Sequence, residues 1–213
     1  IEPHVEDWRE AGICDKSAFL KAGKQGLLCM WADEQYGGLG MTDFRFEQVV
    51  IEETIRHGDI GLFLSLHSRL VGPYIGTLGS EALKQRLLPR MISGETILGV
   101  AMSEPSAGSD ISGIKSRAAR DGDGWIINGS KTYISNGING GAFVVAARSV
   151  PGKSHGLGLF VVEEGMPGFS RGRNLRKMGL KTQDTAELFF ENVRVPVENV
   201  LGDPERGFYQ LMH

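Results

Sequence analysis

The fold is decided by residues 97–135, which read ILGVAMSEPSAGSDISGIKSRAARDGDGWIINGSKTYIS. Apolar residues in this stretch follow the two-residue period of a strand, and glycine-rich turns such as Asp121–Gly124 interrupt them. The residues before Glu95 instead follow the period of a helix. This change of period predicts an α+β chain in which the helices come first and the strands follow.

Toward the C-terminus, the sequence predicts several short strands separated by turn residues. They are Ile97–Met102, Lys115–Arg120, Trp125–Asn128, Phe143–Ala147, Gly158–Val162 and Thr185–Val193. Asn128-Gly129 and Asn136-Gly137 are two of the expected turns, because asparagine and glycine tolerate a positive φ. Such spacing favours a small antiparallel β-barrel or sandwich over βαβ units.

Toward the N-terminus, the sequence predicts a helical bundle. Thr42 is the expected N-cap of a helix with an apolar face from Phe44 to Ile55, and Asp43 would meet its positive end. Pro73 is expected to bend or break the helix that contains it, since it cannot donate a backbone hydrogen bond. The helical segments are Val5–Arg9, Ser17–Lys24, Thr42 to His57-Gly58, Ile60–Leu78 and Ser80 to Ser93-Gly94.

These patterns divide the chain into three parts. We expect an N-terminal helical domain over 1–95, a middle β-domain over 96–203, and the start of a further helix over 204–213, within Arg206–His213. Because the first residue is Ile1 rather than Met, we expect the chain to begin inside its parent sequence or after processing.

Composition excludes several classes of function. The 213 residues carry 23 basic and 26 acidic side chains, so the net charge of −3 provides no basic field for nucleic acid and no polybasic membrane patch. No apolar run approaches the ~18 residues that a spanning helix needs. Cys14 and Cys29 are too few for a disulfide scaffold and lack the spacing of a metal or redox motif, so we expect two reduced thiols.

The first segment that can carry chemistry follows the strand at Ile97. Residues 100–110 read VAMSEPSAGSD, a run of small residues that lets a ligand approach backbone N–H groups. Ser103 and Ser109 add hydroxyls that can donate or accept hydrogen bonds. A polar turn capped by Asp110 is the alternative interpretation.

The second such segment is Lys131–Gly137, which reads KTYISNG. Strand alternation puts Tyr133 and Ser135 on one face. A planar heterocycle with a polar edge needs such a pair, because the ring covers its flat surface and the hydroxyl bonds its rim. The alternative is an exposed pair at a strand end.

Together the two segments resemble the acyl-CoA dehydrogenase family. Further segments of the chain fit the family in order, and the stretch Met178–Phe190 is most similar to its long-chain members. These segments are YGGLG (36–40), GSEALKQRLLPRMISGE (79–95), WIINGSK (125–131), RKMGLKTQDTAELFFENVRVP (176–196) and GFY (207–209). The resemblance implies an N-terminal helical domain, a middle β-domain and a C-terminal four-helix domain, of which the last is absent from these residues.

The resemblance also implies an FAD site. Backbone groups and the Ser103 hydroxyl would bond the pyrimidine edge, Tyr133 would cover the ring, and Ser135 would lie near N5, the hydride acceptor. The implied cofactor-binding residues are Val100, Ala101, Met102, Ser103, Gly108, Ser109, Tyr133, Ile134 and Ser135.

For the acyl-CoA substrate, the resemblance implies contacts from Ser109, Ser154, His155 and Tyr209. A solvated histidine and a helix-core tyrosine are the alternatives for the last two. We interpret Glu104 as a structural residue, because the family takes its base from elsewhere.

Gly37–Gly40 resembles a phosphate loop. No strand precedes it, so a helix-entry turn is the preferred interpretation.

The implied reaction is α,β-dehydrogenation of an acyl-CoA thioester of medium-to-long chain, as in fatty-acid β-oxidation. A glutamate beyond His213 would be the base, so no catalytic residue and no metal ligand is expected within these residues. We therefore expect the chain alone to be inactive and to hold FAD weakly or not at all.

The family further implies an electron-transfer flavoprotein as electron acceptor and a homotetramer. It implies the mitochondrial matrix in a eukaryote or, as we favour here, the bacterial cytoplasm. Two alternatives stay open. One is an enzyme of the same fold, such as a nitroalkane oxidase with an aspartate base or a flavin monooxygenase. The other is a non-catalytic remnant that binds acyl-CoA or a protein partner.

Overall fold

Helices precede strands, as the change of period predicts. The computed structural model describes residues 1–56 and 61–212. Its α-helices are α1 (Val5–Ala11), α2 (Ser17–Lys24), α3 (Phe44–Arg56), α4 (Gly72–Leu78), α5 (Glu81–Ile92) and α6 (Gly207–Met212). Its strands are β1 (Leu98–Ala101), β2 (Arg117–Asp121), β3 (Gly124–Ser135), β4 (Ala142–Arg148), β5 (Leu157–Glu163), β6 (Phe169–Arg171), β7 (Thr185–Pro196) and β8 (Val200–Leu201). None of the described helices is long and apolar enough to cross a membrane.

Local sequence signals set both ends of α5 and the start of α3. The Ser80 hydroxyl accepts the backbone N–H of Leu83 at 3.2 Å and caps α5, which ends before Gly94 at φ +81°. For α3 the predicted cap was one residue early. The carboxylate of Asp43, rather than the Thr42 hydroxyl, accepts the N–H of Arg45 at 3.0 Å. The expected end of this helix at His57-Gly58 lies outside the described residues.

Proline disturbs the second long helical stretch, as expected. Pro73 lies in the first turn of α4, where its missing N–H is tolerated, and the π-helical segment η3 (Leu66–Val71) precedes it. Ile60, the expected start of the stretch, lies outside the described residues.

Gly37–Gly40 forms a turn that packs back on the chain. Gly37, at φ +91°, ends the short 3-10 helix η2 (Glu34–Tyr36), and the N–H of Gly40 donates to the carbonyl oxygen of Ala32 at 2.9 Å. A Cβ at Gly38 would lie 2.0 Å from that same oxygen, so only glycine permits this approach. The segment precedes α3, in agreement with a helix-entry turn.

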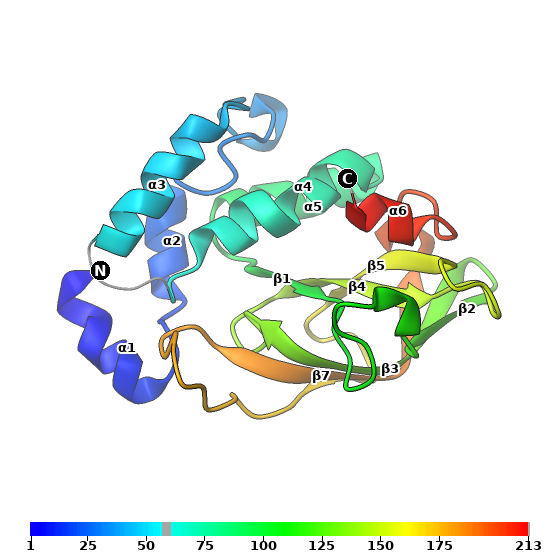
Figure 1. Cartoon of the computed structure of the whole chain (residues 1–213). Helices are drawn as coiled ribbons and strands as arrows, with labels where there is room; N and C mark the ends of the chain where they lie inside the picture. The colour runs from blue at the N-terminus through cyan, green and yellow to red at the C-terminus, as the bar shows by residue number, and fades with distance from the viewer. Residues whose placement is uncertain (57–60, 213) are drawn as a thin grey trace.

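The apolar face of α3 is turned to the outside. Phe44, Phe46, Val49 and Ile55 are each about half exposed, whereas Glu47 is buried. The sequence predicted the amphipathic pattern, but amphipathicity does not say what covers the apolar side. Figure 1 shows α3 lying away from the sheet, while α4 and α5 lie along it.

The sheet of the described residues is mixed, which corrects the expectation of an antiparallel β-barrel. Its order is β6-β7-β3-β2-β4-β5-β8, and β1 pairs in parallel with β4, with Val100 opposite Val144. No pairing of described residues joins the end strands β6 and β8, so the sheet does not close. The β2–β3 hairpin comes between β1 and β4 in the chain, and strand spacing alone does not reveal this crossover.

Strand β3 is much longer than predicted and passes through the expected Asn128-Gly129 turn. It pairs antiparallel with β7, and the register shifts between Ile127 and Gly129. Gly129 has φ +147°, and a Cβ there would lie 2.3 Å from the Ser116 hydroxyl oxygen. The glycine therefore serves a β-bulge and a close packing contact instead of a hairpin turn.

Strand β4 is buried on both faces and joins two apolar cores. Val144 and Ala146 pack with Leu87 and other residues of the helical layer. Phe143 and Val145 point the other way and pack in a second core with residues of β3 and β7. Figure 1 shows the resulting layers, with α4 and α5 on one side of β1, β4 and β5, and with β3 and β7 on the other. This explains why β4 is apolar throughout.

His67 links η3 to α5 and β1 from inside the core. Its Nδ1 accepts the backbone N–H of Leu98 at 3.1 Å, so Nε2 carries the hydrogen and donates to the carbonyl oxygen of Met91 at 3.0 Å. The ring is fully buried, and burial lowers its pKa from 6.5 to about 4. The folded chain therefore holds a neutral imidazole at pH values where the unfolded chain binds a proton.

We expect this histidine to make the fold acid-sensitive. Above pH 6.5 the imidazole is neutral in both the folded and the unfolded chain, so its protonation does not affect stability. Between pH 6.5 and 4 only the unfolded chain binds the proton, and the free energy of unfolding therefore falls by about 3 kcal/mol as the pH drops to 4. Urea unfolding between pH 7 and 4 measures this slope. His67→Gln should flatten it and His4→Gln, at an exposed position, should not; an unchanged slope in His67→Gln contradicts the assignment.

Candidate functional site

The structure brings the loop after β1 next to the end of β3. The backbone N–H of Thr132 donates to the carbonyl oxygen of Ser103 at 2.9 Å. Reciprocal backbone hydrogen bonds between Glu104 and Ala107, at 2.8 and 3.1 Å, close the loop into a tight turn. The two segments selected from the sequence, around Ser103 and around Tyr133, therefore form one surface.

A buried ion pair lies beneath this surface. Lys131 Nζ is 2.8 Å from Glu104 Oε1, and both side chains are buried. Burial raises the pKa of the Glu104 carboxyl, but Lys131 and backbone N–H donors outweigh it and hold the pKa below its ordinary value. Burial lowers the pKa of the Lys131 ammonium to about 8. The pair is therefore ionised at neutral pH, and Glu104 is engaged in the interior.

The predicted cofactor-contacting residues differ in what they expose. The side chains of Ala101 and Ile134 belong to the core, so only their backbone can meet a ligand. Val100 and Met102 are half-buried and pack against the helical core. Ser103 and Ser135 are half-buried, and Gly108 and Ser109 are exposed.

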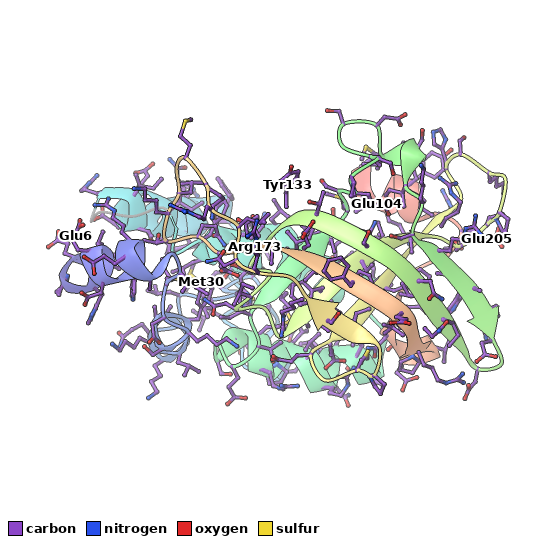
Figure 2. The ribbon with its side chains drawn as sticks, turned by 90° about the horizontal axis from the view of Figure 1, so that it is seen from below. Glu6, Met30, Glu104, Tyr133, Arg173 and Glu205 are labelled. Carbon is purple, nitrogen blue, oxygen red and sulfur yellow. The ribbon has the colours of Figure 1, made fainter. Side chains whose placement is uncertain are left out.

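Tyr133 is 72% exposed and has φ +57°, a left-handed conformation rare for a tyrosine. It lies in a β-bulge, where the β3–β7 register shifts between Lys131 and Ile134. Figure 2 shows its side chain projecting from the ribbon, toward the same side of the molecule as Glu104 and its loop. The bulge aims the ring at open space beside the Ser103 loop.

The predicted substrate-contacting residues form a second group. The His155 ring stacks on Phe208, with centroids 4.0 Å apart, and lies edge-on to Tyr209 at 6.1 Å. Tyr209 is about half exposed. Ser154 is exposed and its carbonyl oxygen accepts from Arg148. The hydrogen bonds from Ser112 are the main reason why the pKa of the Asp110 carboxyl is lowered. The nearby His155 lowers it further. This group therefore adjoins the loop that carries Ser109.

Sequence reasoning missed a polar junction behind β3. Asp184 is buried and its Oδ2 accepts the N–H groups of Ile138 and Asn139, at 2.7 and 3.0 Å. The Asn136 amide donates to the carbonyl oxygen of Leu98 at 2.8 Å and accepts from Gln183 at 2.9 Å. This junction fixes the chain directly after Ser135. The only sequence signal was the polar triplet Gln183–Thr185 before an apolar strand.

The surface fits a flat ligand with a polar edge. Among the described residues, the hydroxyls of Ser103, Ser109 and Ser135 have no hydrogen-bond partner, so they are available to a ligand. The Tyr133 ring is largely exposed, and a Cβ at Gly108 would meet no described atom within 4 Å. This set of donors, ring and open loop suits a planar ligand with a polar edge.

Comparisons with known proteins identify the family. The family model of the acyl-CoA dehydrogenase N-terminal domain matches residues 1–95, and that of the acyl-CoA dehydrogenase middle domain matches residues 99–193. The chain belongs to the acyl-CoA dehydrogenase family. It is thus a member of a family of oxidoreductase enzymes.

Individual acyl-CoA dehydrogenases agree with this assignment. The mitochondrial long-chain specific acyl-CoA dehydrogenase of Sus scrofa is 46% identical over 215 residues, which cover 100% of this chain and 50% of the relative. The crystal structure of an acyl-CoA dehydrogenase from Geobacillus kaustophilus matches at a TM-score of 0.95 and 47% identity, covering 99% of this chain and 56% of that one.

A further neighbour was solved with a reduced cofactor. The glutaryl-CoA dehydrogenase of Mycobacterium smegmatis in complex with FADH2 matches at a TM-score of 0.88 and 31% identity, covering 99% of this chain and 54% of that one. The chain spans about half the length of these acyl-CoA dehydrogenases.

Proposed function

We propose that this chain provides the flavin edge site and part of the acyl-CoA site of an FAD-dependent acyl-CoA dehydrogenase that acts on medium-to-long-chain thioesters. The observation that carries the proposal is the surface where the Ser103 loop meets the end of β3, with the exposed ring of Tyr133 and the hydroxyls of Ser103 and Ser135, unpaired among the described residues. Residues 1–95 would form its helical domain and 96–203 its β-domain.

The chain's own residues would bind and orient the reactants. Backbone groups of Val100–Met102 and the Ser103 hydroxyl would hold the polar edge of the cofactor, and Tyr133 would cover its face and exclude water. A bound flavin supplies the acceptor for the hydride that leaves the β-carbon. Ser135 would donate a hydrogen bond at the reacting edge.

The second group would hold the substrate. Ser109 would contact the thioester region, Ser154 and His155 the CoA moiety, and Tyr209 the acyl chain. The α-proton of a thioester is weakly acidic, so its removal needs a polarised carbonyl and a carboxylate base. We propose that this base is a glutamate outside the described residues. The same reasoning proposes an electron-transfer flavoprotein as electron acceptor, a homotetramer, and a bacterial cytoplasmic location.

Titration with FAD tests the proposal. Saturable chemical-shift changes at the Ser103 and Ser135 amides are expected at millimolar FAD, the weak binding proposed for this chain. Ser103→Ala and Ser135→Ala should each weaken binding by about two- to tenfold, the value of one hydrogen bond. Ser106→Ala, in the same loop and exposed, is the matched control and should bind as the unsubstituted chain does. Saturable shifts at other amides, with none at those of Ser103 and Ser135, would reject the proposed function.

A further inference from the structure

The Lys131–Glu104 pair stands apart from the other described ion pairs. Its side chains are 0% and 3% exposed, whereas each of the other ion pairs described has at least one side chain exposed by 20% or more. Two charges in the interior lose their hydration, and apolar side chains of similar volume often serve stability equally well. Stability alone therefore gives no reason for an ion pair at this position.

The hydrogen bonds of the pair converge on one loop. Lys131 Nζ also donates to the carbonyl oxygen of Met102 at 3.0 Å. The Glu104 carboxylate accepts the backbone N–H groups of Lys115 and Ser116, at 2.6 and 3.0 Å. The loop is thus tied at its start to β3 and at its turn to the segment before β2.

Ser103 lies between the two tied positions. Its neighbours in sequence are Met102, whose carbonyl oxygen binds Lys131, and Glu104, which binds Lys131 through its side chain. Its own carbonyl oxygen accepts the N–H of Thr132, the residue before Tyr133. Three hydrogen bonds consequently fix the position of Ser103 relative to Tyr133. Two are made by the Lys131 ammonium and one by the backbone N–H of Thr132.

We propose that Lys131 and Glu104 are positioning residues that hold the loop Met102–Ser109 in register with the end of β3, so that Ser103 and Ser135 contact one cofactor edge together. The proposal rests on the proposed function for its ligand, although the register itself concerns the chain alone. The residues do not touch the cofactor, since both side chains are inside.

The decisive variant replaces both charges. Glu104→Gln with Lys131→Met leaves no unpaired buried charge and retains the apolar stem of the lysine. It keeps one acceptor oxygen for the two backbone N–H groups, of Lys115 and Ser116, that the carboxylate binds. If the pair only balances charge, the lost acceptor should affect only the amides of Lys115 and Ser116, and those of Thr132 and Ala107 should exchange as in the unsubstituted chain. If the pair positions the loop, the loop should loosen while the core stays intact. Arg194→Met is the control, because it breaks exposed pairs with Asp121 and Asp123.

Amide hydrogen exchange tests, without any ligand, whether the loop stays in register with the end of β3. The amides of Thr132 and Ala107, which donate to Ser103 and Glu104, should exchange at least about tenfold faster in the double variant, relative to the amides of β4 and β5. The control should leave this ratio unchanged. An unchanged ratio in the double variant would overturn the proposal. If the double variant does not fold, Glu104→Gln with Lys131→Leu, which also leaves no buried charge, is judged by the same ratio.

FAD titration, followed at the Ser103 and Ser135 amides, links the register to the site. Binding should be at least about tenfold weaker in the double variant and unchanged in Arg194→Met. Equal affinity of the double variant and the unsubstituted chain would overturn the positioning role. If FAD shifts other amides of the unsubstituted chain instead of those at Ser103 and Ser135, the proposed function fails, and the exchange ratio still decides whether the pair holds the loop.

Discussion

Replacing Gly94 by alanine is expected to destabilise the chain by about 3 kcal/mol, from left-handed strain of about 1–2 kcal/mol and overpacking of about 1–3 kcal/mol. Gly94 has φ +81° where α5 ends, and a Cβ there would lie 2.4 Å from the carbonyl oxygen of Phe19 and 2.9 Å from the nitrogen of Leu20. These are backbone atoms of α2, so no side-chain rotation can relieve the clash. The two helices would have to separate.

Urea unfolding of Gly94→Ala measures the loss, and Gly152→Ala is the matched control. Gly152 also has a positive φ, +74°, but a Cβ there meets no described atom within 4 Å. The control should lose only the conformational part, about 1 kcal/mol. Equal losses at the two positions would show that α2 and α5 are not packed as closely as described.

The second large effect is expected at Asp184. Asp184→Ala removes the acceptor of two backbone N–H groups, those of Ile138 and Asn139, in a site where Asp184 is 1% exposed. Each N–H left unsatisfied in the interior costs about 1–3 kcal/mol, so a loss of about 4 kcal/mol is expected. The turn after β3 would lose its anchor.

Two companion variants separate this cause from a loss of charge. Asp184→Asn keeps an acceptor oxygen and should lose clearly less than Asp184→Ala. Asp110→Ala also removes an acceptor of a backbone N–H, that of Ser112 at 3.0 Å, but at an exposed position, and should cost about 1 kcal/mol or less. If Asp184→Asn were as unstable as Asp184→Ala, the missing charge rather than the orphaned N–H groups would be responsible.

Sequence reasoning succeeded where the determining interaction is local. The Ser80 cap is made to a residue three positions away, and Pro73 acts on its own turn. It failed where the partner is remote in the chain. Strand β3 extends through Asn128-Gly129 because β7, about sixty residues later, supplies its hydrogen bonds. The parallel pairing of β1 with β4 is set in the same way by non-local contacts.

The same contrast between local and remote contacts applies to the candidate site. The motif resemblance selected Ser103, Tyr133 and Ser135, and the structure brings these residues to one surface. It assigned no role to Lys131, whose partner Glu104 is 27 positions away, nor to Asp184, whose partners are 45 and 46 positions away. A lysine within an apolar strand pattern was the available signal, but the pattern does not reveal where its counter-charge lies.

The left-handed backbone of Tyr133 has a consequence for how this position can change. An aromatic residue is poorly suited to φ +57°, while glycine or asparagine would relax there. Selection for thermal stability alone would therefore favour replacement of Tyr133, and under the proposed function such variants would bind the cofactor less tightly. Under the same proposal, a screen for stabilised variants would have to select for cofactor binding as well.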